Sequence, residues 1–144
     1  MIREFEQKDK PDIQRLFAIL TGTMMSEPDL DNRLDFIGNS PIDSLYVYDF
    51  NNKVVGLLGF RIRENIEENS RYGEVSAIVV DPDYQKQGIG KQLMDFAEQL
   101  SESFNCKGTW LVSGFGREEN AHPFYKSLGY ISTGYRFVSL KYKL

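Results

Sequence analysis

The hydrophobic pattern of the first forty residues predicts a short strand followed by two helices. Residues 2–6 form a β-rich run, and apolar positions then recur at helical spacing over residues 13–20. Gly22 is suited to end this helix. A second, less regular helix is predicted over residues 24–37, and the Asn-Ser-Pro sequence at 39–41 should end it before the sheet begins.

The middle of the chain predicts an antiparallel set of strands. Two β-rich runs, residues 44–50 and 53–63, flank a two-residue Asn-Asn turn, and Asn tolerates the positive φ that such a turn requires. A polar stretch at 64–71 then leads to a strongly apolar run at 72–80. We expect this third run to pair with the second through a longer turn.

The pattern from residue 72 onward predicts a strand, a helix and a strand in succession. Apolar positions over residues 89–104 mark one face of a helix, and residues 108–114 form the next strand. This crossover implies that the strands on either side of the helix run parallel. A short helix at 119–129 and two closing strands, 130–133 and 135–144, complete the predicted order.

Composition and charge narrow the class of protein. The 144 residues are 41% hydrophobic with a formal charge of -4, which predicts one globular α/β (α+β) domain over residues 1–144. The acidic balance without a Lys/Arg cluster argues against nucleic acid as a partner. We expect no signal peptide, no membrane span and a cytoplasmic location. Cys106 is the only cysteine, so neither an intrachain disulfide nor a multi-cysteine metal site is expected.

Two glycines lie where the apolar strand meets the following helix, in the sequence YQKQGIGKQL at 84–93. A helix N-terminus offers unpaired N–H donors and the positive end of the helix dipole, which suits a phosphate. A Walker loop would need Ser or Thr at Gln92, and a dinucleotide loop would need a third glycine at Leu93. A diphosphate would fit Gly88 and Gly90, although these glycines could equally serve a tight turn and close helix packing.

Two segments of the chain resemble the GNAT superfamily of acetyl-CoA-dependent N-acetyltransferases. Residues 74–93 match the superfamily pattern of a buried strand followed by Gln/Arg-x-x-Gly-x-Gly/Ala and a helix, and residues 121–130, AHPFYKSLGY, are similar to a later element. GNAT members often have Asn where this chain has Glu118, whereas Asn120 comes two positions later. Within the superfamily, the chain is similar to the aminoalkylphosphonate and small-amine acetyltransferases.

The resemblance implies a GNAT-like mixed, mostly antiparallel sheet with flanking helices and a central parallel splay, in which acetyl-CoA is wedged. The diphosphate would then bind backbone N–H groups of the glycine loop. In the splay, Ile78 and Val80 would keep N–H and C=O groups unpaired by the sheet, which a pantetheine amide could satisfy like an added strand. The implied acetyl-CoA-binding residues are Ile78, Val79, Val80, Gln85, Lys86, Gln87, Gly88, Ile89, Gly90, Lys91, Ser113, Asn120 and Phe124.

Glu74 and Tyr125 are the candidate catalytic residues. Glu74 matches the position of the superfamily's general base, and strand alternation predicts that it shares a face with Ser76 and Ile78. Tyr125 matches the acid that protonates the leaving thiolate. The alternatives are a solvated carboxylate at a strand start and an aromatic ring packed under a short helix.

A nucleophile pair of Cys106 and His122 has no support in the resemblance. A lone cysteine near the end of an amphipathic helix is usually inert packing, and we expect His122 to line or cap the short helix.

These residues together predict an enzyme that moves the acetyl group from acetyl-CoA to a primary amine of a small molecule by direct attack in a ternary complex. Two alternatives stay open, a protein or peptide acetyltransferase acting on an N-terminus or lysine, and a non-catalytic CoA-binding sensor. We expect a small-molecule partner, no nucleic acid, no membrane and possible homodimerisation.

The charge of the acceptor can be predicted in two ways. Acidic residues gather in two segments, which favours a cationic acceptor. The alternative is an anionic acceptor held by an arginine clamp. The acidic residues are Glu27, Asp29, Asp31, Glu64, Glu67 and Glu68, and the candidate clamp residues are Arg61, Arg63 and Arg71.

Overall fold

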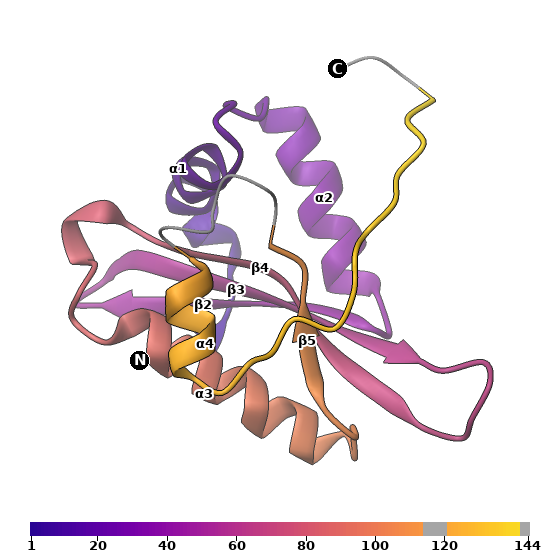
Figure 1. Cartoon of the computed structure of the whole chain (residues 1–144). Helices are drawn as coiled ribbons and strands as arrows, with labels where there is room; N and C mark the ends of the chain where they lie inside the picture. Colours follow the sequence, from indigo (N-terminus) through magenta and orange to yellow (C-terminus); the bar gives the residue numbers. More distant parts are fainter. Residues whose placement is uncertain (114–120, 142–144) are drawn as a thin grey trace. The chain divides into compact units, whose positions relative to one another are not determined.

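The computed structural model of the chain describes residues 1–113 and 121–141 and divides into two compact units, Met1–Leu111 and Val112–Leu144 (Figure 1). The expectation of one domain over the whole chain stays a prediction. None of the helices within the described residues is long and apolar enough to cross a membrane.

The described residues of the first unit form a five-stranded sheet in the order β1-β2-β3-β4-β5. All neighbouring strands are antiparallel except β4 and β5, which run parallel. The predicted mixed, mostly antiparallel sheet is thereby confirmed, with the parallel pair at one edge of the described sheet. The elements are β1 (Ile2–Glu4), η1 (Gln7–Asp9), α1 (Lys10–Thr21), α2 (Glu27–Asn39), β2 (Asp43–Phe50), β3 (Lys53–Glu64), β4 (Arg71–Val80), η2 (Pro82–Tyr84), α3 (Ile89–Ser103) and β5 (Thr109–Leu111).

Local sequence explains where several of these elements begin and end. Asn51 and Asn52 both have positive φ, 52° and 67°, which confirms the two-residue hairpin turn between β2 and β3. Gly22 ends α1 in the left-handed conformation, with φ 82°. The predicted start of α2 at residue 24 is wrong, because the Ser26 hydroxyl accepts a hydrogen bond from the Asp29 N–H and caps a helix that begins at Glu27.

Helices cover both faces of the sheet in the first unit. α1 and α2 lie on one face and α3 on the other (Figure 1). On the first face, buried side chains of α1 and α2 such as Leu16 and Leu34 pack with Leu57 and Val79 of the sheet. On the second face, the ring of Phe96 from α3 contacts the ring of Tyr46 at 4.8 Å between centroids.

A β-bulge interrupts the pairing of β3 with β4. Gly59 pairs with Ala77 whereas the next residue, Phe60, pairs with Val75, so Ser76 is an extra residue on β4. A Cβ atom at Gly59 would lie 2.6 Å from the Ser76 Oγ, which explains why this position lacks a side chain.

The bulge changes which side chains of β4 share a face. Glu74 pairs with Arg61 and Ala77 pairs with Gly59, and Arg61 and Gly59 are two residues apart on one face of β3. Glu74 therefore lies on the α1/α2 face with Ala77. The prediction that it shares a face with Ile78 is wrong, because simple alternation cannot account for the inserted residue. The Ser76 side chain lies beside Gly59 and Ala77 on the Glu74 face, as predicted.

The second unit contains α4 (His122–Ser127), which confirms the predicted short helix. Gly129 follows it with φ 93°. Residues 130–141 contain no strand, so the predicted closing strands are wrong as far as the described residues extend. Alternating apolar residues are not sufficient for a strand, because its backbone N–H and C=O groups must also be paired.

Candidate active site

One edge of β4 is open beyond its first half. β5 pairs only with Gly73, Glu74 and Val75, through Thr109–Leu111. Residues 76–80 have no strand beside them on the β5 side within the described part of the chain. The parallel pairing of β4 with β5 therefore ends after three residue pairs within the described part of the chain.

The hydrogen-bond alternation identifies which groups face this open edge. The Asp81 N–H donates to the Val55 carbonyl at 2.8 Å, so these residues form a hydrogen-bonded pair. Such pairs alternate along an antiparallel ladder, so Val79 directs its backbone groups toward β3. Ile78 and Val80 direct theirs to the open edge.

Three of these four outward groups lack a hydrogen-bond partner among the described residues. The exception is the Val80 carbonyl, which accepts a hydrogen bond from the Gln85 side-chain amide at 3.2 Å. Buried or half-buried backbone groups need partners, so this edge can pair with an extended ligand. Val79, by contrast, offers no backbone group to the edge and its side chain belongs to the core.

The open edge leads into the N-terminus of α3. Gly88 precedes this helix with φ 83°, and no side chain caps the helix. The first helical hydrogen bond runs from the Gln92 N–H to the Gly88 carbonyl at 3.0 Å, so the N–H groups of Ile89, Gly90 and Lys91 have no acceptor within the helix. An added Cβ at Gly88 would meet nothing within 4 Å, so the positive φ and not crowding by the protein favours glycine there.

The other residues of the glycine loop contribute in different ways. Lys86 has a positive φ of 64°, and it and Gln87 are exposed. The Lys91 ammonium pairs with Asp95 at 2.9 Å, one turn further along the helix. The Ile89 side chain is buried, so only its backbone N–H can serve a ligand.

An ion pair that the sequence analysis missed connects this loop to α1. The buried Asp81 carboxylate accepts hydrogen bonds from the Asp83 N–H at 2.9 Å and from Arg15 at 2.5 Å. Burial alone would raise the pKa of Asp81, but these two hydrogen bonds outweigh it and hold that pKa below its ordinary value. The Asp-Pro-Asp sequence after the strand indicates the cap, whereas nothing local identifies Arg15 as the partner.

Glu74 lies half-buried at the start of the open edge. Its side chain is 16% exposed, and its Oε1 is 3.6 Å from the Arg63 Nε. That oxygen is buried and has no hydrogen-bond partner within the described residues. The Arg63 guanidinium in turn lies over the Trp110 ring at 5.5 Å. Glu74 is therefore a half-buried carboxylate in an ion pair, and a carboxylate is a candidate general base.

The second unit carries the other predicted site residues. Tyr125 lies on α4, with its ring 5.4 Å from that of Phe124 and 6.4 Å from that of Tyr130. The buried Ser113 hydroxyl has no hydrogen-bond partner among the described residues. Asn120 lies outside the described residues, so its predicted contact with acetyl-CoA stays a prediction.

His122 and Cys106 show no sign of a nucleophile pair. His122 is the first residue of α4. Burial raises the pKa of the Cys106 thiol, which disfavours the reactive thiolate.

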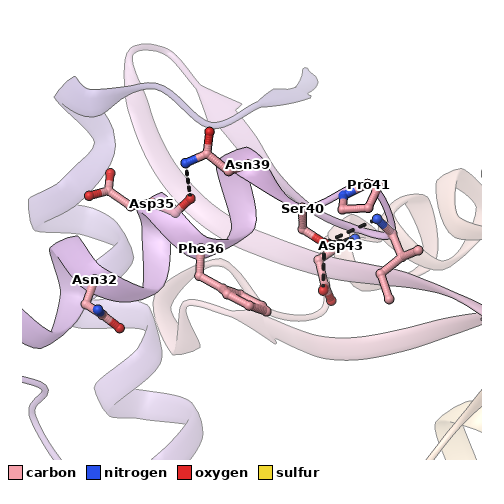
Figure 2. A pocket seen from close by; sticks show the side chains of 8 residues that line it. Asn32, Asp35, Phe36, Asn39, Ser40, Pro41 and Asp43 are labelled. Atoms are coloured by element: carbon pink, nitrogen blue, oxygen red, sulfur yellow. Dashed lines mark hydrogen bonds between the residues drawn. The ribbon is translucent and has the colours of Figure 1, made fainter.

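Two hollows lie on the α1/α2 face. We call the first the Arg61 hollow, which has a volume of about 170 Å³ and is lined by Phe17, Arg33, Phe36, Ile37, Asp43, Ser44, Leu45, Gly59, Arg61, Ser76 and Ala77. The second is a wider, open hollow between the end of α2 and the start of β2 (Figure 2). Phe36 and Asp43 line both. The bulge therefore turns Glu74 to the face that contains both hollows.

The acidic segments are largely neutralised by ion pairs. Lys10 pairs with Glu27 and Asp31, which weakens the case for a cationic acceptor at α2. Arg71 forms an ion pair with Glu64 at 2.6 Å and lines neither hollow, which weakens the case for Arg71 as an anion clamp. Glu68 pairs with Lys107 in the same way.

Comparisons with known proteins agree with this architecture. A solved structure of a GNAT family acetyltransferase from Staphylococcus aureus is 29% identical, covers 97% of both chains and superposes with a TM-score of 0.81. An aminoalkylphosphonate N-acetyltransferase from Salmonella typhimurium is 26% identical over 138 residues, 94% of this chain and 89% of that protein. The catalytic subunit of the N-terminal acetyltransferase B complex from Arabidopsis thaliana is 33% identical over 82 residues, 56% of this chain and 45% of that protein.

The family pattern itself runs through both units. The acetyltransferase (GNAT) family matches residues 11–130, from the first turn of α1 to the residue after Gly129. This range includes the open edge of β4, the glycine loop and α4. The chain therefore belongs to the acetyltransferase (GNAT) family and is an acetyl-CoA-dependent N-acetyltransferase.

Proposed function

We propose that this enzyme transfers the acetyl group of acetyl-CoA directly to a primary amine of a small molecule, within a ternary complex. The observation that carries the proposal is the continuous path from the open edge of β4 to the uncapped N-terminus of α3, with Glu74 at its other end. Along this path, backbone N–H and C=O groups of β4 can pair with the pantetheine arm of acetyl-CoA, and the N–H groups of α3 can bind its diphosphate. The Glu74 carboxylate is then available to the substrate amine.

Acetyl-CoA fits the groups that the first unit leaves unpaired. The pantetheine amides would pair with Ile78 and with the Val80 N–H, as an added strand pairs with a sheet edge. The diphosphate would bind the N–H groups at the start of α3, where the helix dipole also favours negative charge. Gly88 leaves the space beside this turn open.

The acceptor amine requires a base. A primary amine is largely protonated near neutral pH and must lose a proton before its lone pair can attack the thioester carbonyl. Glu74 takes that proton on its carboxylate, directly or through one water. The new C–N bond then forms as the C–S bond breaks, and the sulfur leaves as a thiolate.

Tyr125 supplies the proton that the departing thiolate takes up. Its position in the sequence HPFYKSLGY at 122–130 matches the superfamily element that carries the acid. The acetyl group passes directly to the amine, so no acetyl-enzyme forms. The attacking nitrogen loses a second proton, which restores the Tyr125 hydroxyl, and Glu74 releases the first proton to solvent. The products are the N-acetylated amine, CoA and one proton.

A protein N-terminus is the second candidate acceptor, favoured by the partial match to the Arabidopsis subunit. The aminoalkylphosphonate acetyltransferase matches far more of this chain, and the Arg61 hollow of about 170 Å³ suits a small molecule better than a peptide. Assays with short amines and with peptides separate the two, because a peptide enzyme would prefer peptides by a large factor in kcat/KM.

We expect Gly88→Ala to weaken CoA binding by at least about tenfold in Kd. The methyl group strains the left-handed turn and displaces the donors that follow it, at a cost of about 1–2 kcal/mol. Calorimetric titration with CoA measures the effect. Gly22→Ala is the matched control, because Gly22 has nearly the same φ and equally open surroundings at the end of α1. Equal CoA affinity in both variants would remove the turn from the binding site.

Glu74→Gln should lower kcat by about 10²-fold or more, because the amide cannot accept the amine proton as a carboxylate does. CoA affinity should stay close to that of the parent. Thiol-release kinetics with a saturating amine measures this loss. Glu64→Gln, at the far end of β3 in an exposed ion pair, should retain activity. A variant at Glu74 that keeps the parental kcat with chemistry rate-limiting would return Glu74 to a structural role.

Tyr125→Phe should lower kcat by about 10²-fold, since only the hydroxyl is lost and a thiolate can leave without protonation. CoA affinity and thermal stability should change little. Tyr130→Phe tests a neighbouring ring in the same unit and should leave kcat within a factor of about three. If both variants retain full kcat, or if acetylated protein accumulates before any amine is added, the proposed chemistry is wrong.

A further inference from the structure

We infer that the Arg61 hollow is an anion subsite, and that the preferred acceptor is a short-chain amine that also carries a phosphonate, phosphate or carboxylate group. This inference rests on the proposed function, because it specifies the acceptor of that reaction. The inference depends on hydrogen-bond donors that line the hollow and have no partner within the described residues.

The acidic group in the hollow is already satisfied. One oxygen of the Asp43 carboxylate accepts from the Arg61 Nε at 2.6 Å, and the other accepts from the Ser40 hydroxyl at 3.1 Å. Figure 2 shows the Ser40 contact beside Asp43, whose side chain is 9% exposed. Asp43 therefore holds Arg61 in place and has little remaining capacity to bind an ammonium group.

The groups that remain unused are hydrogen-bond donors. Arg61 donates a hydrogen bond to Asp43 through its Nε. Its two terminal nitrogens have no hydrogen-bond partner within the described residues. Arg33 lines the same hollow, where its Nε and one terminal nitrogen donate to Asn32 and its guanidinium lies over the Phe36 ring at 5.2 Å. Its other terminal nitrogen has no hydrogen-bond partner within the described residues. The exposed hydroxyl of Ser76 is presented by the bulge. Guanidinium and hydroxyl donors that line one hollow suit a ligand rich in acceptors, and an anionic oxygen group is the strongest of these.

The positively charged Arg61 lies next to the candidate base, Glu74. Arg61 and Glu74 are directly paired across β3 and β4, and the Cβ atoms of such partners lie about 5 Å apart. The hydrogen bond with Asp43 and the nearby Glu74 raise the pKa of Arg61, so its charge is permanent. A molecule with an anion at one end and an amine a few carbons away can place the first at Arg61 and the second at Glu74.

The volume of the hollow limits this acceptor. About 170 Å³ accommodates a tetrahedral or planar oxyanion with a short chain. Phe17, Phe36 and Ile37 contribute apolar walls, which strengthen the attraction of the arginines for a bound anion.

A matched series of three-carbon amines tests the subsite: propylamine, 3-aminopropanoate, 3-aminopropylphosphonate and 1,3-diaminopropane. We expect kcat/KM to be about 10- to 100-fold higher for the two anionic amines than for propylamine, and lowest for the diamine. Arg61→Gln should bring this ratio close to one, and Ser76→Ala should lower it a few-fold. The control Arg71→Gln, at the far end of the hairpin, should keep the parental ratio.

A binding experiment separates failure of the subsite from failure of the proposed reaction. Propylphosphonate has no amine, and it should bind the parent and Arg71→Gln by calorimetry but bind Arg61→Gln at least about tenfold more weakly. Thermal melting establishes that each variant is folded. Equal rates across the amine series, a preference for the diamine, or propylphosphonate binding that Arg61→Gln leaves unchanged would each overturn the subsite. Turnover of none of the amines, with propylphosphonate binding intact, would instead contradict the proposed function.

Discussion

The inserted residue Ser76 in β4 is the constraint on which the rest of the site depends. It shifts the register of β4 against β3 by one residue, so Val75 and Ala77 lie on opposite faces. Glu74 thereby reaches the α1/α2 face, where the hollows lie, while Ile78 and Val80 still direct backbone groups to the open edge. A regular strand in this position could satisfy only one of these two requirements.

The glycine loop depends on supports that lie far from it in the sequence. Arg15 on α1 holds Asp81, and Asp81 caps the short turn that leads from β4 to the loop. Because the cap stabilises the backbone before Gly88, the donors at the start of α3 are set before a ligand arrives. Binding then loses less free energy to the ordering of the loop.

Sequence alone predicts the features that local chemistry determines. The Asn-Asn turn requires positive φ, and the helical spacing of apolar residues in α3 defines its buried face, so both were predicted and are confirmed. The bulge could not be predicted, because it exists only in the pairing of β4 with β3. Arg61 was predicted only as one of three candidate clamp arginines, and its partner Asp43, 18 residues away, distinguishes it from the other two. The closing strands were predicted from alternation alone, and the described residues 130–141 form no strand.

Binding of acetyl-CoA along the open edge of β4 and at the start of α3 is the central proposal for this enzyme. Amide hydrogen exchange, followed residue by residue by NMR with and without acetyl-CoA, tests it most directly. The N–H groups of Ile78, Val80 and 89–91 should become protected, whereas those of Ala77 and Val79, already paired with β3, should change little. Protection that develops elsewhere, with Ile78, Val80 and 89–91 unchanged, would contradict the account.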